Sequence, residues 1–228
     1  TYLNPGALSP AQHGLLLVSS RAWNFHRSFS VPVQRKILDP VERGMTLVVL
    51  AQDYAPNRYR LDWLPKPLTV ENRRERVFDP TGWLGLPRID DDDILRQRFL
   101  PAPGWQIQAN GAAAVLPWGK GRIILFSVRY LERLHVPGCA VSLETILSIA
   151  GRDKPVVVMA AGTEGATLAS SAVVDFMNAR DIPFLTLGEV IARNQGESPL
   201  KAIPGRLDDD DLLAALDLRG DQMVNSAL

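Results

Sequence analysis

The sequence predicts an α/β protein built on an open, mostly parallel sheet with helices on both faces and one long insertion. Three apolar runs without polar alternation, at residues 14–20, 45–51 and 155–161, indicate strands that are buried on both sides. Segments with helical spacing alternate with these runs, which is the order of βαβ units. A length of 228 residues suits one large domain of this class.

The N-terminal part of the chain shows the first of these units. The run at residues 14–20 is bounded by stretches that contain Pro and Gly, as is typical of a buried strand. Between residues 33 and 42 the apolar side chains follow helical spacing, and Gly44 is placed to end that helix. The β-branched run at residues 45–51 then predicts a second strand.

Residues 56–104 differ from their surroundings and predict a long insertion without regular structure. The segment is rich in Pro, Arg and Asp and has little periodicity. Its acidic run Asp90–Asp93 predicts the start of a short helix that continues to Arg98, because carboxylates at a helix start cap free N–H groups. A similar run occurs at residues 206–213. Clustered carboxylates also leave a calcium site as the alternative, although the EF-hand spacing is absent.

The remaining elements continue the alternation of strands and helices. Residues 112–117 and 122–128 predict a hairpin that turns at Trp118–Gly121. The later segments predict helix, strand, helix, strand and two helices, over residues 141–150, 155–161, 166–180, 183–187, 187–194 and 207–218. We therefore divide the chain into a domain over residues 1–151 and a βα extension of the same domain with a helical tail over residues 152–228.

Composition excludes several classes of function. The chain has 25 Lys and Arg residues and 25 Asp and Glu residues, whereas binders of nucleic acid or anionic membranes carry a basic surplus. No apolar run reaches the roughly 18 residues that a membrane span requires. Cys139 is the only cysteine, so no internal disulfide is expected, and no zinc-binding motif is present. We expect no nucleic-acid or membrane partner and assign no compartment.

Two places carry candidate ligand-binding residues. Asp53 and Arg58 follow the strand at 45–51, and the carboxyl ends of parallel strands form the ligand crevice of open sheets. Gly162, Thr163 and Gly165 lie in a turn between a strand and a helix, where backbone N–H groups can bind an anion. The turn matches neither nucleotide-binding motif, so no cofactor is expected. A solvated loop and a tight turn are the structural alternatives at the two places.

Trp63 and Trp83 of the insertion are candidate interface residues. Tryptophan and arginine are enriched in interface hot spots, and ordering a long loop requires compensating contacts. We expect this segment to pack against a partner chain or an adjoining domain; the alternative is that its tryptophans cover the core. Cys139 offers a thiol before a helix, with His135 nearby in the sequence, but we favour a small buried residue, because no second basic group or orienting residue is identifiable.

Three segments resemble a known family. Residues 114–126 read AVLPWGKGRIILF, two strands joined by GKGR, and residues 41–50 read VERGMTLVVL, a passage from helix to strand. With the helix at 143–151, this order is similar to class I glutamine-amidotransferase-like domains, which occur as accessory domains in β-galactosidase-like glycoside hydrolases and in trehalose-utilisation-like proteins. The resemblance covers residues 10–151 and implies a flavodoxin-like fold.

The departures from that family affect its chemistry. Its members carry a cysteine elbow after the strand that matches 47–50, where this chain reads Ala51-Gln52-Asp53, and a histidine after the strand that ends at Phe126, where none occurs before His135. The resemblance therefore implies a non-catalytic domain of a larger carbohydrate-processing enzyme, which serves assembly or shapes a neighbouring active site. Its partners would be other domains or chains of that enzyme, or a second copy of this chain.

Two alternatives remain open. The first is a free-standing hydrolase with a site at the carboxyl ends of the strands, for which the candidate residues are Asp53, Ser127, Glu132 and His135. The second is a sugar-binding module. We assign no catalytic residue from the sequence.

Overall fold

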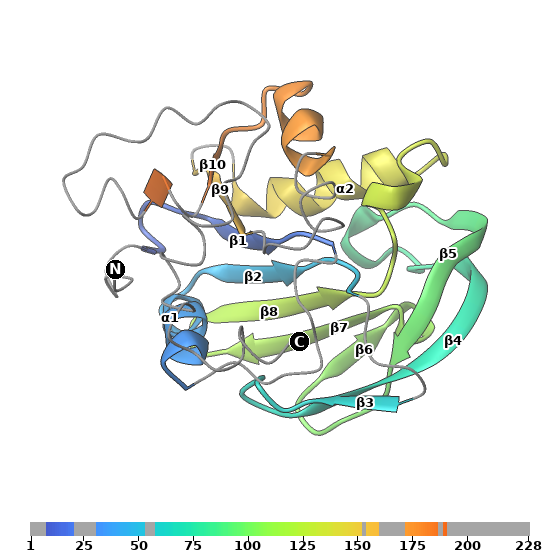
Figure 1. Cartoon of the computed structure of the whole chain (residues 1–228), viewed down its shortest axis with the longest axis horizontal. Coiled ribbons are helices and arrows are strands. Elements are labelled where there is room, and N and C mark those ends of the chain that lie inside the picture. The colour runs from blue at the N-terminus through green and yellow to red at the C-terminus, as the bar shows by residue number, and fades with distance from the viewer. Residues whose placement is uncertain are drawn as a thin grey trace, which may run out of the picture.

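The main feature of the computed structural model is a seven-stranded sheet with the order β10-β9-β1-β2-β8-β7-β6 (Figure 1). The structure describes residues 8–20, 31–52, 58–151, 154–159, 172–186 and 189–190. The strands of this sheet are β1 (Leu15–Val18), β2 (Thr46–Val49), β6 (Gln106–Gln108), β7 (Ala113–Trp118), β8 (Gly121–Phe126), β9 (Val156–Met159) and β10 (Phe184–Thr186). All neighbours from β10 to β8 are parallel, and β7 and β6 add antiparallel pairs, which confirms the predicted α/β class.

The apolar runs form the centre of this sheet. Every residue of β1 and β2 is buried, and Leu15 pairs with Thr46 on one side and with Val156 on the other. The predicted β7–β8 hairpin is present, with Trp118 opposite Gly121. A Cβ atom at Gly121 would lie 2.2 Å from the carbonyl oxygens of Val41 and Met45, so this close approach requires glycine.

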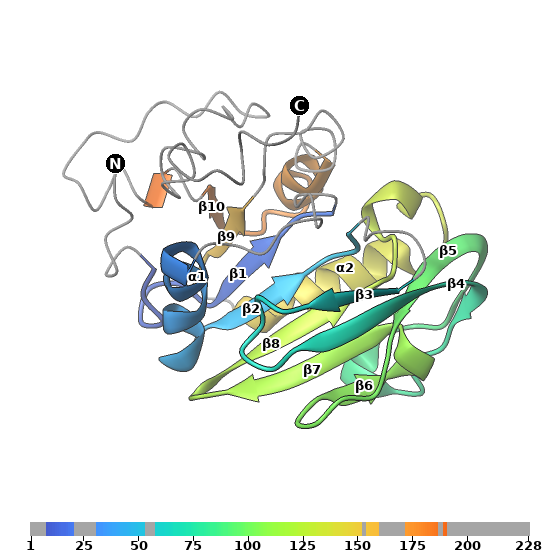
Figure 2. The same cartoon turned by 60° about the horizontal axis from the view of Figure 1, so that its bottom comes forward.

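Helices cover both faces of the sheet (Figure 2). Successive strand residues point to opposite faces, so β1 contributes Leu16 and Val18 to one core and Leu15 and Leu17 to the other. Helix α1 (Val31–Glu42) packs on the first core through Ile37 and Val41. Helix α2 (Cys139–Leu147) and the helical residues 172–178 cover the second core.

The prediction that the insertion lacks regular structure is wrong, because its residues form a second sheet. It contains the antiparallel strands β3 (Arg58–Leu61), β4 (Leu68–Phe78) and β5 (Ile89–Phe99) in that spatial order. We call β4 and β5 with their connection the ribbon. On β4 Leu68 and Val70 are buried while their neighbours are partly exposed, which is the alternation of a half-buried strand.

The helix predicted from Asp90–Asp93 to Arg98 is wrong, because these residues belong to β5. The carboxylate of Asp92 bonds Arg76 of β4 at 2.7 Å instead of capping a helix. A second pair of opposite charge joins the same two strands, between Glu71 of β4 and Arg98 of β5. Cross-strand pairs of opposite charge stabilise antiparallel strands. The acidic run therefore reflects strand pairing, an outcome that local propensity does not reveal.

The ribbon bends around the end of the central sheet at which β2 and β8 terminate (Figures 1 and 2). Its register shifts between Asn72 and Glu75, and again between Glu75 and Val77. Such bulges bend a strand and increase its twist. One half of the ribbon contributes to the core under α1 and the other half to the core under α2; these buried residues are Leu68, Val70 and Phe99 for the first and Phe78, Ile89 and Ile94 for the second.

Trp63, one of the two candidate interface residues, is 3% exposed and belongs to the core under α1. Its burial agrees with the alternative that the tryptophans of the insertion cover the core, while packing of the insertion against a partner stays a prediction. Trp83 is half-buried, and its ring lies 5.7 Å from that of Phe126 between centroids. Neither tryptophan therefore presents a whole ring to a partner.

Strands β9 and β10 extend the parallel part of the sheet beyond β1, so they share its core. The turn after β9 and the tail from residue 191 onward, including the helix predicted over residues 207–218, lie outside the described residues. Among the described helices, none is both long and apolar enough to cross a membrane.

Candidate anion-binding site

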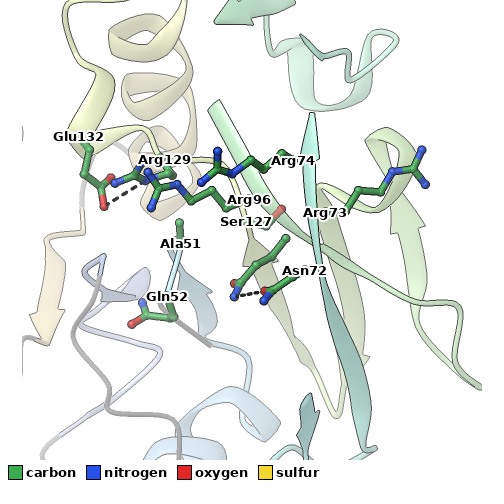
Figure 3. Close-up of a pocket in the computed structure, with 10 residues that line it drawn as sticks. Ala51, Gln52, Asn72, Arg73, Arg74, Arg96, Ser127, Arg129 and Glu132 are labelled. Atoms are coloured by element: carbon green, nitrogen blue, oxygen red, sulfur yellow. Dashed lines mark hydrogen bonds and ion pairs between the residues drawn. The ribbon is translucent and has the colours of Figure 1, made fainter. Parts of the chain in front are cut away.

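A pocket of about 390 Å³ opens where β2 and β8 end and the ribbon bends over them (Figure 3). Parallel strands converge there at their carboxyl ends, the edge at which open α/β sheets bind ligands. The pocket is lined by residues from three places: the ends of β2 and β8, the bulge of β4, and the middle of β5. These are Ala51, Gln52, Asn72, Arg73, Arg74, Arg96, Gln97, Ser127, Arg129 and Glu132.

Three arginines point toward a common space in this pocket, one from each element that closes it (Figure 3). Arg74 comes from the bulge of β4, Arg96 from β5, and Arg129 from the segment after β8. The fourth lining arginine, Arg73, points away in this view and bonds Glu75 at 2.5 Å. We call Arg74, Arg96 and Arg129 the arginine cluster.

Asp93 holds two members of the cluster. Its carboxylate accepts two hydrogen bonds from Arg96, both at 2.7 Å, and one from Arg129 at 2.5 Å. Arg133 donates a further bond at 2.9 Å. The hydrogen bond from Arg96, together with the charge of Arg129 and the bond from Arg133, holds the pKa of the Asp93 carboxyl well below its usual range. Asp93 is therefore a permanent anion that fastens β5 to the segment after β8.

Arg74 differs from the other two members. Arg129 lies 4.0 Å from Glu132 in addition to its bond with Asp93. Arg74, by contrast, is exposed and forms no ion pair or hydrogen bond with any residue that the structure describes. Its guanidinium can therefore bind an anion without breaking an existing pair.

Apart from the arginines, Glu132 and Ala51, the pocket lining is polar and uncharged. Gln52 donates from Nε2 to the carbonyl oxygens of Ser19 and Leu50, both at 2.7 Å. Gln97 donates to Oδ1 of Asn72 at 3.2 Å. These bonds tie the side chains to the strand ends, so this wall is preorganised.

Most of the residues predicted to bind a ligand cannot be placed. Asp53, Gly162, Thr163 and Gly165 lie outside the described residues. Arg58 is the first residue of β3, and its side chain also lies outside the described part. The pocket lies at the carboxyl ends of the strands, where the sequence places the candidate residues, and their role in ligand binding stays a prediction.

The three described candidates for a hydrolase site, Ser127, Glu132 and His135, do not form a catalytic set with one another, and the fourth, Asp53, lies outside the described residues. Ser127 and Glu132 both line the pocket, but Ser127 is buried and donates from Oγ to the carbonyl of Ala112 at 3.1 Å. His135 is exposed and is not part of the lining. Among these three residues, no base is paired with the hydroxyl in the way that activates a serine.

Cys139 is buried and fits the structural interpretation of this residue. Burial, with a smaller contribution from the negative charge of Asp91, raises the pKa of its thiol to about 11. A protonated thiol is a poor nucleophile and a poor metal ligand. Within the described ranges, no three His, Cys, Asp or Glu side chains group closely enough to hold a metal ion, and Asp90–Asp93 lie along one strand.

Sequence reasoning missed the arginine cluster. Arg129 could have been found, because it follows a predicted strand at the ligand-binding edge. Arg74 and Arg96 reach the pocket only because the ribbon bends over that edge, and no local signal predicted the bend. Comparison with family models, curated proteins and solved structures finds no match to this chain.

Proposed function

We propose that this chain is a non-catalytic α/β domain that binds a small anionic ligand in the arginine pocket. The observation that carries the proposal is the convergence of Arg74, Arg96 and Arg129 on one pocket, with no described partner for Arg74. Guanidinium groups bind phosphate and carboxylate through paired, charge-assisted hydrogen bonds. An anion between the three side chains would also offset their mutual repulsion.

The state of the candidate nucleophiles supports a binding role. The hydroxyl of Ser127 is bonded to a backbone carbonyl, and the thiol of Cys139 is buried with a raised pKa. The two segments at which the resembled family carries its cysteine and histidine both line this pocket, and here they contribute Gln52 and Arg129. Under that resemblance, the pocket would correspond to an amidotransferase active site in which Gln52 and Arg129 replace the nucleophile and the base.

We also propose that the domain belongs to a larger carbohydrate-processing enzyme, and this part of the proposal rests on the resemblance alone. In that setting the domain would couple ligand binding to assembly or to a neighbouring active site. An assay for glutaminase and glycosidase activity tests the non-catalytic part. We expect no turnover, and glutaminase activity that disappears in Cys139→Ala would contradict the proposal.

The binding part is tested by isothermal titration of the full chain with inorganic phosphate at fixed ionic strength. Arg74→Ala should weaken binding by about tenfold or more, because a hydrogen bond to a charged group contributes about 1.5–3 kcal/mol. Its stability should change by less than about 0.5 kcal/mol, as expected for an unpaired surface residue.

The matched control is Arg76→Ala on the same strand. Arg76 pairs with Asp92 at the surface, its side chain is 70% exposed, and it does not line the pocket. Its substitution removes the same charge from β4 and should leave phosphate affinity unchanged within about twofold. Equal losses in the two variants would show only nonspecific attraction to the ribbon and would contradict a site at Arg74.

A further inference from the structure

The pocket is divided into a cationic wall and a neutral, hydrogen-bonding wall. The arginine cluster and Glu132, which lies 4.0 Å from Arg129, line the first (Figure 3). Gln52, Asn72, Gln97 and Ser127 line the second. Both walls are largely built by the same two strands: Asn72 and Arg74 lie on β4, and Arg96 and Gln97 lie on β5. A bound molecule would therefore meet charge on one side and uncharged polar groups on the other.

The neutral wall discriminates among the possible bodies of an anionic ligand. Carboxamides donate and accept hydrogen bonds, as hydroxyl groups do, so an amide wall matches a hydroxylated carbon chain. The described lining contains no aromatic side chain on which a nucleobase could stack, and its only apolar side chain is that of Ala51. An alkyl chain could form no hydrogen bond with these amides and would displace the water around their exposed atoms, at a desolvation cost.

We infer that the ligand is a small anionic polyol, a phosphate ester or a carboxylic acid of a polyhydroxylated carbon chain. This inference rests on the proposed function and specifies its ligand. A pocket of about 390 Å³ lies near the lower end of the roughly 300–1,000 Å³ that ligand sites span, which suits a molecule of monosaccharide size. The arginine cluster would take the anionic group, and Asn72 with Gln97 would take hydroxyl groups.

The test compares anionic ligands with and without hydroxyl groups, by isothermal titration calorimetry of the full chain. A hexose 6-phosphate should bind about tenfold more tightly than hexyl phosphate, because its hydroxyl groups form additional hydrogen bonds whose gain is only partly offset by the cost of ordering the ligand. A six-carbon aldonic acid compared with hexanoate repeats the test for a carboxylate and shows which anionic group is preferred. Free hexose should bind more weakly than its phosphate.

Two single-residue variants test whether the neutral wall causes the preference for hydroxylated ligands. Asn72→Ala should lower the ratio of hexose 6-phosphate to hexyl phosphate affinity by about threefold or more, since Asn72 is exposed and supplies one of the amide groups of the neutral wall. The control Gln106→Ala removes an exposed amide on β6, outside the pocket, and should retain the full ratio.

The outcomes separate this inference from the proposed function. Equal affinity of the wild-type protein for each hydroxylated ligand and its alkyl counterpart, with Arg74-dependent phosphate binding, would overturn the polyol and leave the anion site intact. An unchanged ratio in Asn72→Ala would overturn the assignment of the neutral wall. Absence of any phosphate or carboxylate binding would contradict the anion site itself.

Discussion

Replacement of Asp93 by asparagine should destabilise the protein strongly for a single polar substitution. The carboxylate is the common acceptor for Arg96, Arg129 and Arg133, through four hydrogen bonds of 2.5–2.9 Å. The variant keeps the size and shape of the side chain but removes its charge and half of its accepting capacity. Three guanidinium groups would then face one another without the anion that holds them.

The magnitude follows from the exposure of each partner. Arg96 is 48% exposed, so its pair contributes at most about 1 kcal/mol after solvent screening. Arg129 and Arg133 are 17% and 27% exposed, and we assign about 1 kcal/mol to each of their charge-assisted bonds. The free energy of unfolding should therefore fall by about 2–3 kcal/mol in Asp93→Asn.

Urea denaturation followed by far-ultraviolet circular dichroism measures this change. The control is Asp92→Asn at the next position of β5, where a single ion pair with Arg76 joins side chains that are 79% and 70% exposed. Its effect should stay below about 0.5 kcal/mol. Equal stabilities of the two variants would refute the view that Asp93 organises the cluster.

The stabilisation that Asp93 provides should decrease as the pH falls. The pKa of Asp93 is lowered in the folded protein from an ordinary value of 3.8, so its contribution is complete above that value and is lost as the pH falls through the lower, folded value. The difference in unfolding free energy between wild type and Asp93→Asn should be constant above about pH 5.5 and shrink below about pH 4. A difference that grows on acidification would exclude this mechanism.

Two further predictions concern the packing of the central sheet. Cys139 should react slowly with a disulfide reagent at about pH 8 in the folded protein and rapidly after unfolding, because its pKa is raised to about 11; fast reaction of the native chain would contradict its burial. Gly121→Ala should lower the unfolding free energy by about 3 kcal/mol, since its Cβ would lie 2.2 Å from two backbone oxygens. Gly85→Ala should lower it by only about 1 kcal/mol, because no atom lies within 4 Å of the added Cβ and only the left-handed backbone is strained. Urea midpoints measure both variants, and equal losses would contradict the steric explanation.

The central sheet could be predicted because its signal is local. β1 and β2 are covered on both faces, so every side chain in them except that of Thr46 is apolar, and this pattern is visible without knowledge of their partners. The hairpin of β7 and β8 was equally visible, because Trp118 and Gly121 close a tight turn. The order of the strands, by contrast, follows from crossovers that join segments distant in the sequence.

The ribbon could not be predicted in the same way. In β5 the residues Asp90–Asp93 interrupt the alternation that marks a half-buried strand, and the regular part, Leu95 to Phe99, is only five residues long. The charges that obscure the pattern are satisfied by β4 and by the segment after β8, through Arg76 and Arg129. Pairing of this kind depends on the tertiary fold, so local propensity favoured a helix cap that does not form.

The same charges explain how the site is assembled. Arg96 and Arg129 would repel each other if the ribbon approached the sheet edge alone, and Asp93 between them makes that approach favourable. The bridge between Leu95 and Val128 then fixes the ribbon beside the end of β8. The bulge at Asn72–Glu75 turns β4 across the same edge and brings Arg74 to the pocket.

An insertion that only covered the core would gain little from this concentration of arginine at a solvent-accessible edge. Burial of Leu68, Val70, Phe78 and Phe99 already anchors both halves of the ribbon, and at about 1.5–3 kcal/mol for each large apolar side chain these residues outweigh the ion pairs. The ion pairs around Asp93 therefore contribute a smaller part of the free energy that holds the ribbon in place. What they do add is a fixed orientation: Asp93 keeps two guanidinium groups turned toward the pocket, and Arg74 lies beside them without a partner of its own among the described residues. A preorganised set of donors of this kind binds an anion with little loss of side-chain entropy, which favours recognition over mere attachment as the role of the cluster.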